Sequence, residues 1–311
     1  MDEVNVDLDM LRATVVDRIS SHVDCANIVT VDDMEYVRVL ALAAQEGWRA
    51  HHMDVKSAFL NGDLKEEVYV QQPLGYTVAG EEGKVYRLRK ALYGLLQALR
   101  AWNAKLDNTL KALGFQQSDH EAAMYRRGSG RTVLLVGVYV DDLIITGAAE
   151  DEVEAFKAQM KQIFDMSDLG TLTFYLGVEV HQDATGITLR QTHYAKRILE
   201  LGGMDGCNPA NTPMEERLRL SKNSTAAQVD PTHYRRLIGS LRYVVHTCPD
   251  LAYAVGFVSR FMERPTVEHQ GAVKRILRYL AGTLDYGLHY IKAPGGARFI
   301  GYTDSDLAER R

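Results

Sequence analysis

The amino-acid sequence predicts an α+β fold. Two apolar, β-branched runs in residues 132–147 flank a polar break at Asp141 and Asp142, a pattern typical of a β-hairpin. Apolar residues recur at helical spacing over residues 92–113 and again over residues 232–280. The 311 residues suffice for two or three packed units of ordinary size.

Composition indicates an ordinary globular protein, with 46% hydrophobic and 25% charged residues. No apolar stretch has the length needed to span a bilayer, and the acidic N-terminus lacks the apolar core of a signal peptide. We therefore expect neither a membrane partner nor secretion. Cys25, Cys207 and Cys248 lack metal-type spacing, and we interpret them as idle thiols in a reducing compartment.

Charge is distributed unevenly along the chain. The net charge of −5 argues by itself against nucleic-acid binding. The first 50 residues are strongly acidic, however, and residues 231–280 are basic. A basic stretch of this kind indicates either a phosphate-contacting surface or ordinary solvated helix faces, and charge alone does not decide between them.

The first half of the chain is predicted to alternate helices with short strands. In order, we expect a helix over 34–46, a strand over 48–55, a helical turn over 56–60, strands over 68–76 and 85–88, the long helix over 92–113, and the hairpin. Most of the apolar residues that recur along the long helix are expected to be core residues: Leu92, Leu95, Leu96, Leu99, Trp102, Leu106, Leu110 and Leu113.

The second half is predicted to end in a group of helices. A helix begins at Asp151 and buries Val153, Phe156, Met160, Ile163 and Phe164. Further on we expect a strand over 171–180 with its partner at 186–190, a helix over 193–201, a linker over 208–225, helices over 232–247, 250–262 and 266–280, and strands over 286–291 and 298–303. The linker is the best candidate for a domain boundary.

Three aspartates are candidates for a metal site. Asp141 and Asp142 repel each other at the hairpin tip unless a cation neutralises them, although a solvated acidic turn is the alternative. Asp54 ends a predicted strand, where it could also serve as a helix cap. Aspartates from one strand and a neighbouring hairpin can hold two divalent ions, which is the arrangement that phosphoryl transfer requires.

The motif from Tyr139 to Asp142 resembles the signature of reverse transcriptases, and its surroundings are similar to the copia-type retrotransposon version. Other segments resemble the same family in the same order: 53–64, 67–73, 92–98, 100–102, 175–179, 238–243, 274–280 and 301–306. The resemblance covers roughly residues 34–306. An ordered set of this kind is far more specific than the four-residue motif alone.

The resemblance implies an RNA-directed DNA polymerase that adds deoxynucleotides to a primer 3′-hydroxyl. Its partners would be an RNA template, a DNA primer–template duplex and deoxynucleoside triphosphates. Two Mg²⁺ ions, with Mn²⁺ as an alternative, would be held by Asp54, Asp141 and Asp142. The resemblance also implies an intracellular location, in a cytoplasmic particle or the nucleus, and leaves the oligomeric state open.

Further roles follow from the resemblance alone. Phe59 matches the steric gate that excludes a 2′-hydroxyl, Gln97 and Tyr139 match nucleotide-binding positions, and Leu176 with Gly177 matches the primer grip. Plainer interpretations are a core aromatic for Phe59, a polar helix surface for Gln97 and a strand bulge at Gly177. Contacts with the nucleic-acid backbone are implied for Arg235, Arg236, Arg242, Lys274, Arg275 and Arg278. Asp304 matches the first acid of a ribonuclease H domain.

The implied fold is a palm with an antiparallel sheet backed by helices, followed by a helical thumb and connection. We expect an unmatched acidic segment over 1–33, the palm with partial fingers over 34–190, thumb and connection helices over 191–285, and a truncated ribonuclease H start over 286–311. Leu96 and Leu99 replace the usual Lys and Pro of the family. Leu307 begins a departure from the ribonuclease H pattern, so ribonuclease H activity is not expected.

Two alternatives remain open. One is an inactive, truncated retrotransposon remnant that only binds nucleic acid, which the missing fingers pattern in residues 1–33 favours and the intact acids disfavour. The other is a different two-metal enzyme, such as a nuclease, which nothing outside the acids supports.

Overall fold

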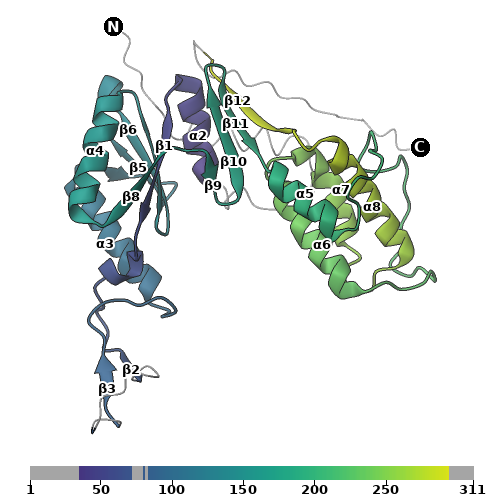
Figure 1. Ribbon diagram of the computed structural model, residues 1–311, viewed down its shortest axis with the longest axis horizontal. Coiled ribbons are helices and arrows are strands. Elements are labelled where there is room, and N and C mark those ends of the chain that lie inside the picture. The colour runs from purple at the N-terminus through teal and green to yellow at the C-terminus, as the bar shows by residue number, and fades with distance from the viewer. Residues whose placement is uncertain (1–34, 72–79, 81–82, 294–311) are drawn as a thin grey trace, which may run out of the picture. The chain divides into compact units, whose positions relative to one another are not determined.

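The structure is a computed structural model that describes residues 35–71, 80 and 83–293 (Figure 1). Several predicted features lie outside these residues: the acidic segment 1–33, Cys25, residues 72–76 of the strand over 68–76, the strand over 298–303, and residues 294–311 of the ribonuclease H start with Asp304 and Leu307. The chain divides into two compact units. In the described part, residues 48–171 form one, called the sheet unit, and residues 35–47 with 172–293 form the other, called the helical unit.

A six-stranded antiparallel sheet forms the centre of the sheet unit, with the order β4–β5–β6–β7–β1–β8. Its strands are β1 (Ala50–Val55), β4 (Gln116–Gln117), β5 (Met124–Arg127), β6 (Leu134–Tyr139), β7 (Asp142–Gly147) and β8 (Met166–Thr171). Strand β1 therefore lies beside the predicted hairpin, although it comes much earlier in the sequence. Antiparallel sheets combined with helices confirm the predicted α+β class.

Helices α3 (Ala98–Ala112) and α4 (Glu150–Ile163) pack on one face of this sheet. That face is formed by Met53 and Val55 of β1, Leu134 and Val136 of β6, and Leu143 and Ile145 of β7. The helices contribute Trp102, Leu106, Leu110, Val153, Phe156 and Met160. Because successive strand side chains point to opposite faces, Asp54 and Asp142 project from the other face of the sheet.

The hairpin of β6 and β7 turns one residue earlier than predicted. Its turn consists of Val140 and Asp141, so Asp142 is the first residue of β7 and pairs with Tyr139. Val140 has a φ of 56°, a left-handed conformation that β-branched residues rarely adopt. The prediction of a turn at Asp141 and Asp142 is wrong because valine gives no sequence signal for this conformation.

Helix α3 begins six residues later than predicted. Gly94 has a φ of 92°, which a right-handed helix does not allow, and the chain from Leu92 to Gln97 forms turns instead. Leu92, Leu96 and Leu99 are exposed, so they are exceptions to the burial expected for most of the apolar residues of this segment, and the predicted burial of Ile163 on α4 is wrong. The rest of the unit consists of η2 (Ala58–Asn61), η3 (Gly130–Thr132) and the ribbon of β2 (Tyr69–Gln71) with β3 (Val85–Arg87).

The helical unit combines a second antiparallel sheet with helices. Its sheet has the order β12–β11–β10–β9, and α2 (Glu35–Glu46) packs beside β11 and β12. The strands are β9 (Phe174–Tyr175), β10 (Val178–Asp183), β11 (Gly186–Arg190) and β12 (Gly287–Ile291). The predicted single strand over 171–180 is wrong, because a turn at Leu176 and Gly177 divides it into β9 and β10.

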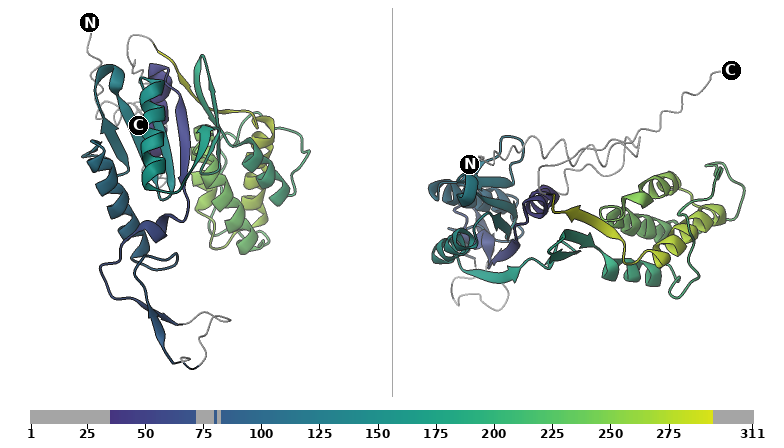
Figure 2. Two further views of the ribbon diagram at one scale, coloured as in Figure 1. Left: turned by 60° about the vertical axis from the view of Figure 1, so that its left-hand side comes forward. Right: turned by 90° about the horizontal axis from the view of Figure 1, so that it is seen from above.

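Four helices share one hydrophobic core of this unit, and their bundle is seen in Figure 2. They are α5 (Thr192–Leu201), α6 (Pro231–Val244), α7 (Ala252–Ser259), which follows η4 (Pro249–Leu251), and α8 (Val267–Gly282). Helix α6 begins where predicted because Asp230 accepts hydrogen bonds from the N–H groups of Thr232 and His233, and Pro231 takes the first helical position.

In the described part of the chain, every helix is too short or too polar to cross a bilayer.

Residues 172–190 are grouped with these helices, whereas the predicted domains place them with the hairpin. The predicted domain boundaries follow the family resemblance and not packing, so they stay a prediction.

Candidate active site

The three predicted acids lie near one another at the end of β1, but among these described residues the three carboxylates do not all offer oxygens within 4.8 Å of one another. Asp54 lies directly opposite Asp142 in the antiparallel pair of β1 and β7. Directly opposed residues have Cβ atoms about 4.5–5.5 Å apart. Asp141 precedes Asp142 in the turn, and all three side chains are half-buried. The sheet thus brings together carboxylates that are far apart in the sequence.

The backbone of the turn is held from two sides. The N–H of Val55 donates to the carbonyl oxygen of Asp141 at 2.9 Å, which ties the turn to the end of β1. The indole Nε1 of Trp102 donates to the carbonyl oxygen of Val140 at 2.5 Å, which ties it to α3. Trp102 was predicted only as a core residue, and its role in fixing the turn has no sequence signal.

Electrostatics at this cluster favour a bound cation. The pKa of Asp54 is raised, first by burial and then by the negative charges of Asp141 and Asp142, while His52 and Lys56 oppose the shift. A divalent cation would remove this repulsion, and carboxylate oxygens are the ligands that Mg²⁺ prefers. Three carboxylates are therefore donors of a type that suits Mg²⁺.

His52 joins the acids and was missed from the sequence. Its Nε2 lies 2.6 Å from Oδ1 of Asp142, and both side chains are half-buried. His52 precedes Asp54 by two residues on β1, so the alternation of strand side chains places both on one face. That spacing is the signal that could have identified it.

Three predicted nucleotide-binding residues lie in the same unit. Phe59 in η2 is half-buried, packs against the main core and lies 5.5 Å from the ring of Tyr93. Its plainer interpretation as a core aromatic is thus partly correct. Gln97 immediately precedes α3, and Tyr139 is about half exposed and pairs with Asp142.

The predicted primer-grip residues belong to the helical unit. Leu176 and Gly177 form the two-residue turn between β9 and β10, with φ values of 45° and 81°. Both residues are half-buried. A turn with two positive φ values replaces the strand bulge that we considered as the plainer interpretation.

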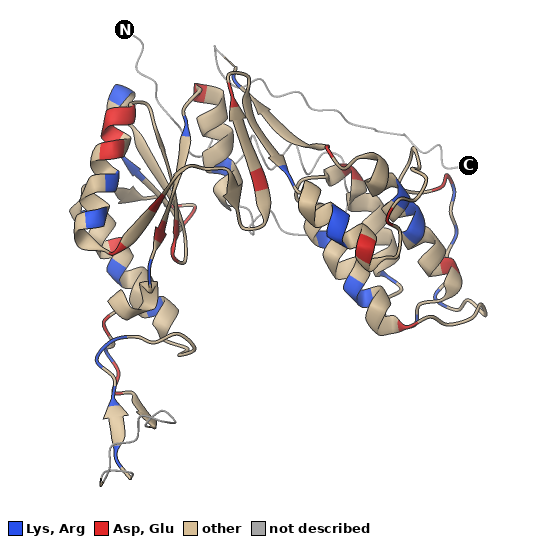
Figure 3. Cartoon of the chain, in the orientation of Figure 1, with Lys and Arg blue, Asp and Glu red and all other residues tan. Residues whose placement is uncertain are grey.

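The six predicted phosphate-binding residues fall into two groups on the helices of this unit, where Lys and Arg residues are numerous (Figure 3). Three are engaged within the protein. Arg235 donates to the Met262 carbonyl at 3.3 Å, Arg275 lies 3.2 Å from Glu215, and Arg278 donates to the Asn208 carbonyl at 2.7 Å. The other three are exposed and make no hydrogen bond or ion pair with any described residue: Arg236, Arg242 and Lys274.

A second set of possible metal ligands is already neutralised. Nitrogen and oxygen atoms of His51, Glu150 and Glu154 lie within 4.8 Å of one another, on the helix-covered side of the sheet. The buried Lys157 ammonium lies 3.0 Å from Nδ1 of His51 and 2.7 Å from Glu154, and 3.6 Å from Asp168. A fixed positive charge at this position leaves little electrostatic reason for a metal ion.

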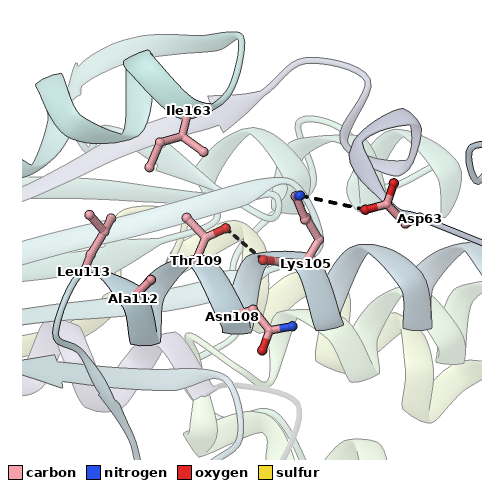
Figure 4. Close-up of a pocket in the computed structure, with 7 residues that line it drawn as sticks. All are labelled: Asp63, Lys105, Asn108, Thr109, Ala112, Leu113 and Ile163. Atoms are coloured by element: carbon pink, nitrogen blue, oxygen red, sulfur yellow. Dashed lines mark hydrogen bonds and ion pairs between the residues drawn. The ribbon is translucent and has the colours of Figure 1, made fainter.

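An open hollow of about 430 Å³ lies beside α3 (Figure 4). Its lining residues are Asp63, Lys105, Asn108, Thr109, Ala112, Leu113 and Ile163. Lys105 forms a 3.8 Å ion pair with Asp63 at its edge. The hollow contains none of the predicted site residues, so it is separate from the acid cluster.

Comparison with known proteins gives a consistent result. Residues 16–216 match the family model described as "Reverse transcriptase (RNA-dependent DNA polymerase)". The chain is 39% identical over 270 residues to the Retrovirus-related Pol polyprotein from transposon RE1 of Arabidopsis thaliana, covering 87% of this chain and 18% of that protein. It is also 39% identical over 282 residues to the corresponding protein from transposon TNT 1-94 of Nicotiana tabacum, covering 87% of this chain and 21% of that protein.

A shorter relative matches along most of its length. The putative transposon Ty5-1 protein of Saccharomyces cerevisiae is 32% identical over 240 residues, which cover 76% of this chain and 78% of that protein. The chain therefore spans about a fifth of the plant Pol polyproteins that it matches, and most of this shorter protein.

Proposed function

The chain belongs to the reverse transcriptase family of copia-type retrotransposons, and from this premise we propose that it carries the polymerase centre of an RNA-directed DNA polymerase. The reaction is template-directed addition of a deoxynucleotide to a primer 3′-hydroxyl with release of pyrophosphate. The pairing of Asp54 with Asp142, beside Asp141 in the turn, is the observation that carries the proposal. We further propose that the sheet unit is the palm and that α5 to α8 form the thumb and connection.

The three aspartates would hold two Mg²⁺ ions, or Mn²⁺ in their place. Such ions lower the pKa of the attacking hydroxyl and stabilise charge on the phosphate oxygens and the leaving group. The protein's own contribution is to keep three mutually repelling carboxylates together. The hydrogen bonds from Val55 and Trp102 to the turn support this role, because they fix the backbone that carries Asp141.

The nucleotide would lie beside Phe59, Gln97 and Tyr139. Phe59 follows Asp54 closely in the chain, and its packing against the core and Tyr93 restricts its ring. A restricted ring suits a steric gate, because a mobile ring would move aside for a 2′-hydroxyl. The exposure of Tyr139 opposite Asp142 is consistent with contact to the incoming nucleotide.

The primer–template duplex would be bound by the helical unit. Arg236, Arg242 and Lys274 are the cations best suited to phosphates, because they have no described partner to give up. Arg235, Arg275 and Arg278 would first have to leave their present contacts. Binding is expected to depend on salt and not on sequence.

Primer extension on an RNA template with Mg²⁺ and deoxynucleotides tests the proposal. The parent protein should extend the primer, and Asp141→Asn should abolish extension. The matched control is Asp119→Asn, an exposed aspartate of the same unit, which should extend like the parent. Equal extension by Asp141→Asn and parent would refute the proposed centre.

The same assay separates the alternatives. A parent that binds the duplex in a salt-dependent manner but does not extend it would indicate an inactive remnant, which the exposed basic residues would explain. Cleavage of labelled duplex without nucleotides would indicate a nuclease.

A further inference from the structure

The turn between β9 and β10 has an unfavourable backbone conformation. Tyr175 pairs with Val178, so the turn contains only Leu176 and Gly177, both with positive φ. Two-residue hairpin turns with two positive φ values are of type I′, which favours Asn, Asp and Gly. A leucine in the first position is disfavoured because its Cβ approaches the following carbonyl oxygen. Contacts from elsewhere in the unit must therefore hold the turn.

Tyr243 of α6 provides such a contact. Its hydroxyl donates a hydrogen bond to the carbonyl oxygen of Leu176. A Cβ atom on Gly177 would lie 2.6 Å from that hydroxyl oxygen, so only glycine leaves room for the tyrosine. The Tyr243 ring meets the ring of Tyr194 edge-on, with centroids 5.0 Å apart, which anchors it in the helix bundle.

A second aromatic pair supports the base of the turn. Tyr175 immediately precedes the turn and is buried, and its ring lies 5.0 Å from that of Tyr36 in an edge-on arrangement. The strand before the turn is thus fixed by packing, and the Tyr243 hydroxyl, which also interacts electrostatically with Tyr36, holds the turn itself. Removing one oxygen atom from Tyr243 should therefore loosen the turn and leave its surroundings in place.

We propose that Tyr243 is a positioning residue for primer binding, an inference that rests on the proposed function. Its hydroxyl holds the backbone of Leu176 and Gly177, the predicted primer grip, in the shape that would approach the sugar–phosphate backbone of the primer. The neighbouring Arg242, and Arg236 two turns earlier on α6, are exposed and unpaired among described residues. One helix therefore carries both the support of the turn and two cations for the duplex.

The test uses a fluorescent DNA primer annealed to an RNA template, with Kd measured by anisotropy and extension measured at saturating duplex. Tyr243→Phe removes only the hydroxyl. We expect Kd to rise by roughly two- to tenfold, the worth of one hydrogen bond, with kcat nearly unchanged. A Kd equal to that of the parent would overturn the proposal.

Tyr234→Phe is the matched control. Tyr234 lies on the same helix, and its hydroxyl donates to the carbonyl oxygen of Val258 at 2.9 Å inside the bundle. Its loss should lower stability without changing Kd. If both variants weaken duplex binding equally, the effect is general destabilisation of the bundle, and the proposal is wrong.

A rescue variant tests the route through the turn. Asparagine tolerates the left-handed conformation, so Leu176→Asn combined with Tyr243→Phe should hold the turn without the hydroxyl and restore Kd. A double variant as weak as Tyr243→Phe alone would overturn positioning through the turn. A parent that does not bind the duplex would instead refute the proposed function, so the two failures are distinguishable.

Discussion

The indole N–H of Trp102 donates a 2.5 Å hydrogen bond to the carbonyl oxygen of Val140, in the turn that carries Asp141. Val140 holds a left-handed conformation that is costly for a valine, of order 1–3 kcal/mol for such outliers. Trp102 is completely buried between α3 and the sheet, so it is a rigid support. The position of the turn that carries Asp141 therefore depends on a buried core residue.

We expect Trp102→Phe to reduce primer extension more than its effect on stability would suggest. The change should lower the free energy of unfolding by roughly 1–3 kcal/mol, through the lost hydrogen bond and a smaller ring. Misplacement of the turn should slow extension by at least about tenfold. Urea unfolding and single-turnover extension measure the two effects.

Phe164→Leu is the control for Trp102→Phe. The Phe164 ring meets the Trp102 ring edge-on at 5.2 Å, so its replacement disturbs the same part of the core. The indole hydrogen bond remains, and extension by folded protein should stay near that of the parent. Equal loss of extension in both variants would show that core packing, and not the hydrogen bond, positions the turn.

We expect Asp54→Asn to stabilise the protein while abolishing extension. The folded-state pKa of Asp54 is raised, so the folded protein binds this proton more tightly than the unfolded chain. Near neutral pH, above both pKa values, the charged carboxylate therefore lowers stability, and asparagine removes that cost. The gain should shrink as pH falls toward the ordinary aspartate pKa of about 4.

Urea unfolding in metal-free buffer, with and without added Mg²⁺, tests this expectation. Mg²⁺ should stabilise the parent and should have a much smaller effect on Asp54→Asn, because bound ligand stabilises the folded state. Asp119→Asn, which changes the net charge equally at an exposed position, should match the parent throughout. An Asp54→Asn protein less stable than the parent would contradict the argument.

Sequence patterns predicted the parts of the fold that long apolar periodicities encode. The hairpin, α4 and the helices of the bundle were predicted because many residues contribute to each pattern. Strands β4, β5 and β8 were missed because they are short or polar and acquire their place only through pairing. The start of α3 was misplaced because the leucines before Ala98 keep helical spacing while Gly94 breaks the helix.

The site shows the same division. The aspartates were candidates because carboxylates at a strand end and a hairpin tip suit metal binding, and the family resemblance assigned them that role, which stays a prediction. The support from Trp102 and the turn contact of Tyr243 were not, because each depends on one hydrogen bond between distant segments. Val140 could not be predicted at a positive φ, since its residue type indicates the opposite.

His52→Ala should weaken metal binding. The imidazole Nε2 at 2.6 Å from Asp142 Oδ1 orients that carboxylate, and groups that orient metal ligands typically contribute about tenfold or more to metal affinity. We expect Mn²⁺ affinity, measured by electron paramagnetic resonance without substrates, to fall by about that factor. Extension should then require correspondingly more Mg²⁺.

The control for His52→Ala is His181→Ala. His181 is exposed and lies 3.5 Å from Asp183 in the helical unit, so its removal also breaks a His–Asp pair but does not touch the acid cluster. This variant should bind Mn²⁺ like the parent. Unchanged Mn²⁺ affinity in His52→Ala would exclude an orienting role for His52.

The stability of the helical unit should fall in mild acid because of His269. This side chain is completely buried, its Nδ1 accepts a hydrogen bond from the N–H of Thr266 at 3.0 Å, and its Nε2 lies 3.2 Å from the carbonyl oxygen of Ser221. Burial lowers the pKa of His269, although the nearby Glu268 and the Ser221 contact oppose the shift. The folded protein therefore binds this proton less tightly than the unfolded chain.

Neutral His269 therefore contributes its full share to the free energy of unfolding above the unfolded histidine pKa of about 6.5. This contribution is lost as the pH falls toward the lower pKa of His269 in the folded protein. Protonation places a hydrogen on Nδ1, where it faces the N–H of Thr266, the N-cap residue of α8, and breaks the hydrogen bond between them. We expect the free energy of unfolding to fall more steeply below about pH 6.5 in the parent than in His269→Gln, which cannot titrate. Urea unfolding across that range measures both slopes, with His181→Gln as the exposed control. Parallel curves for the parent and His269→Gln would show that other groups set the acid sensitivity.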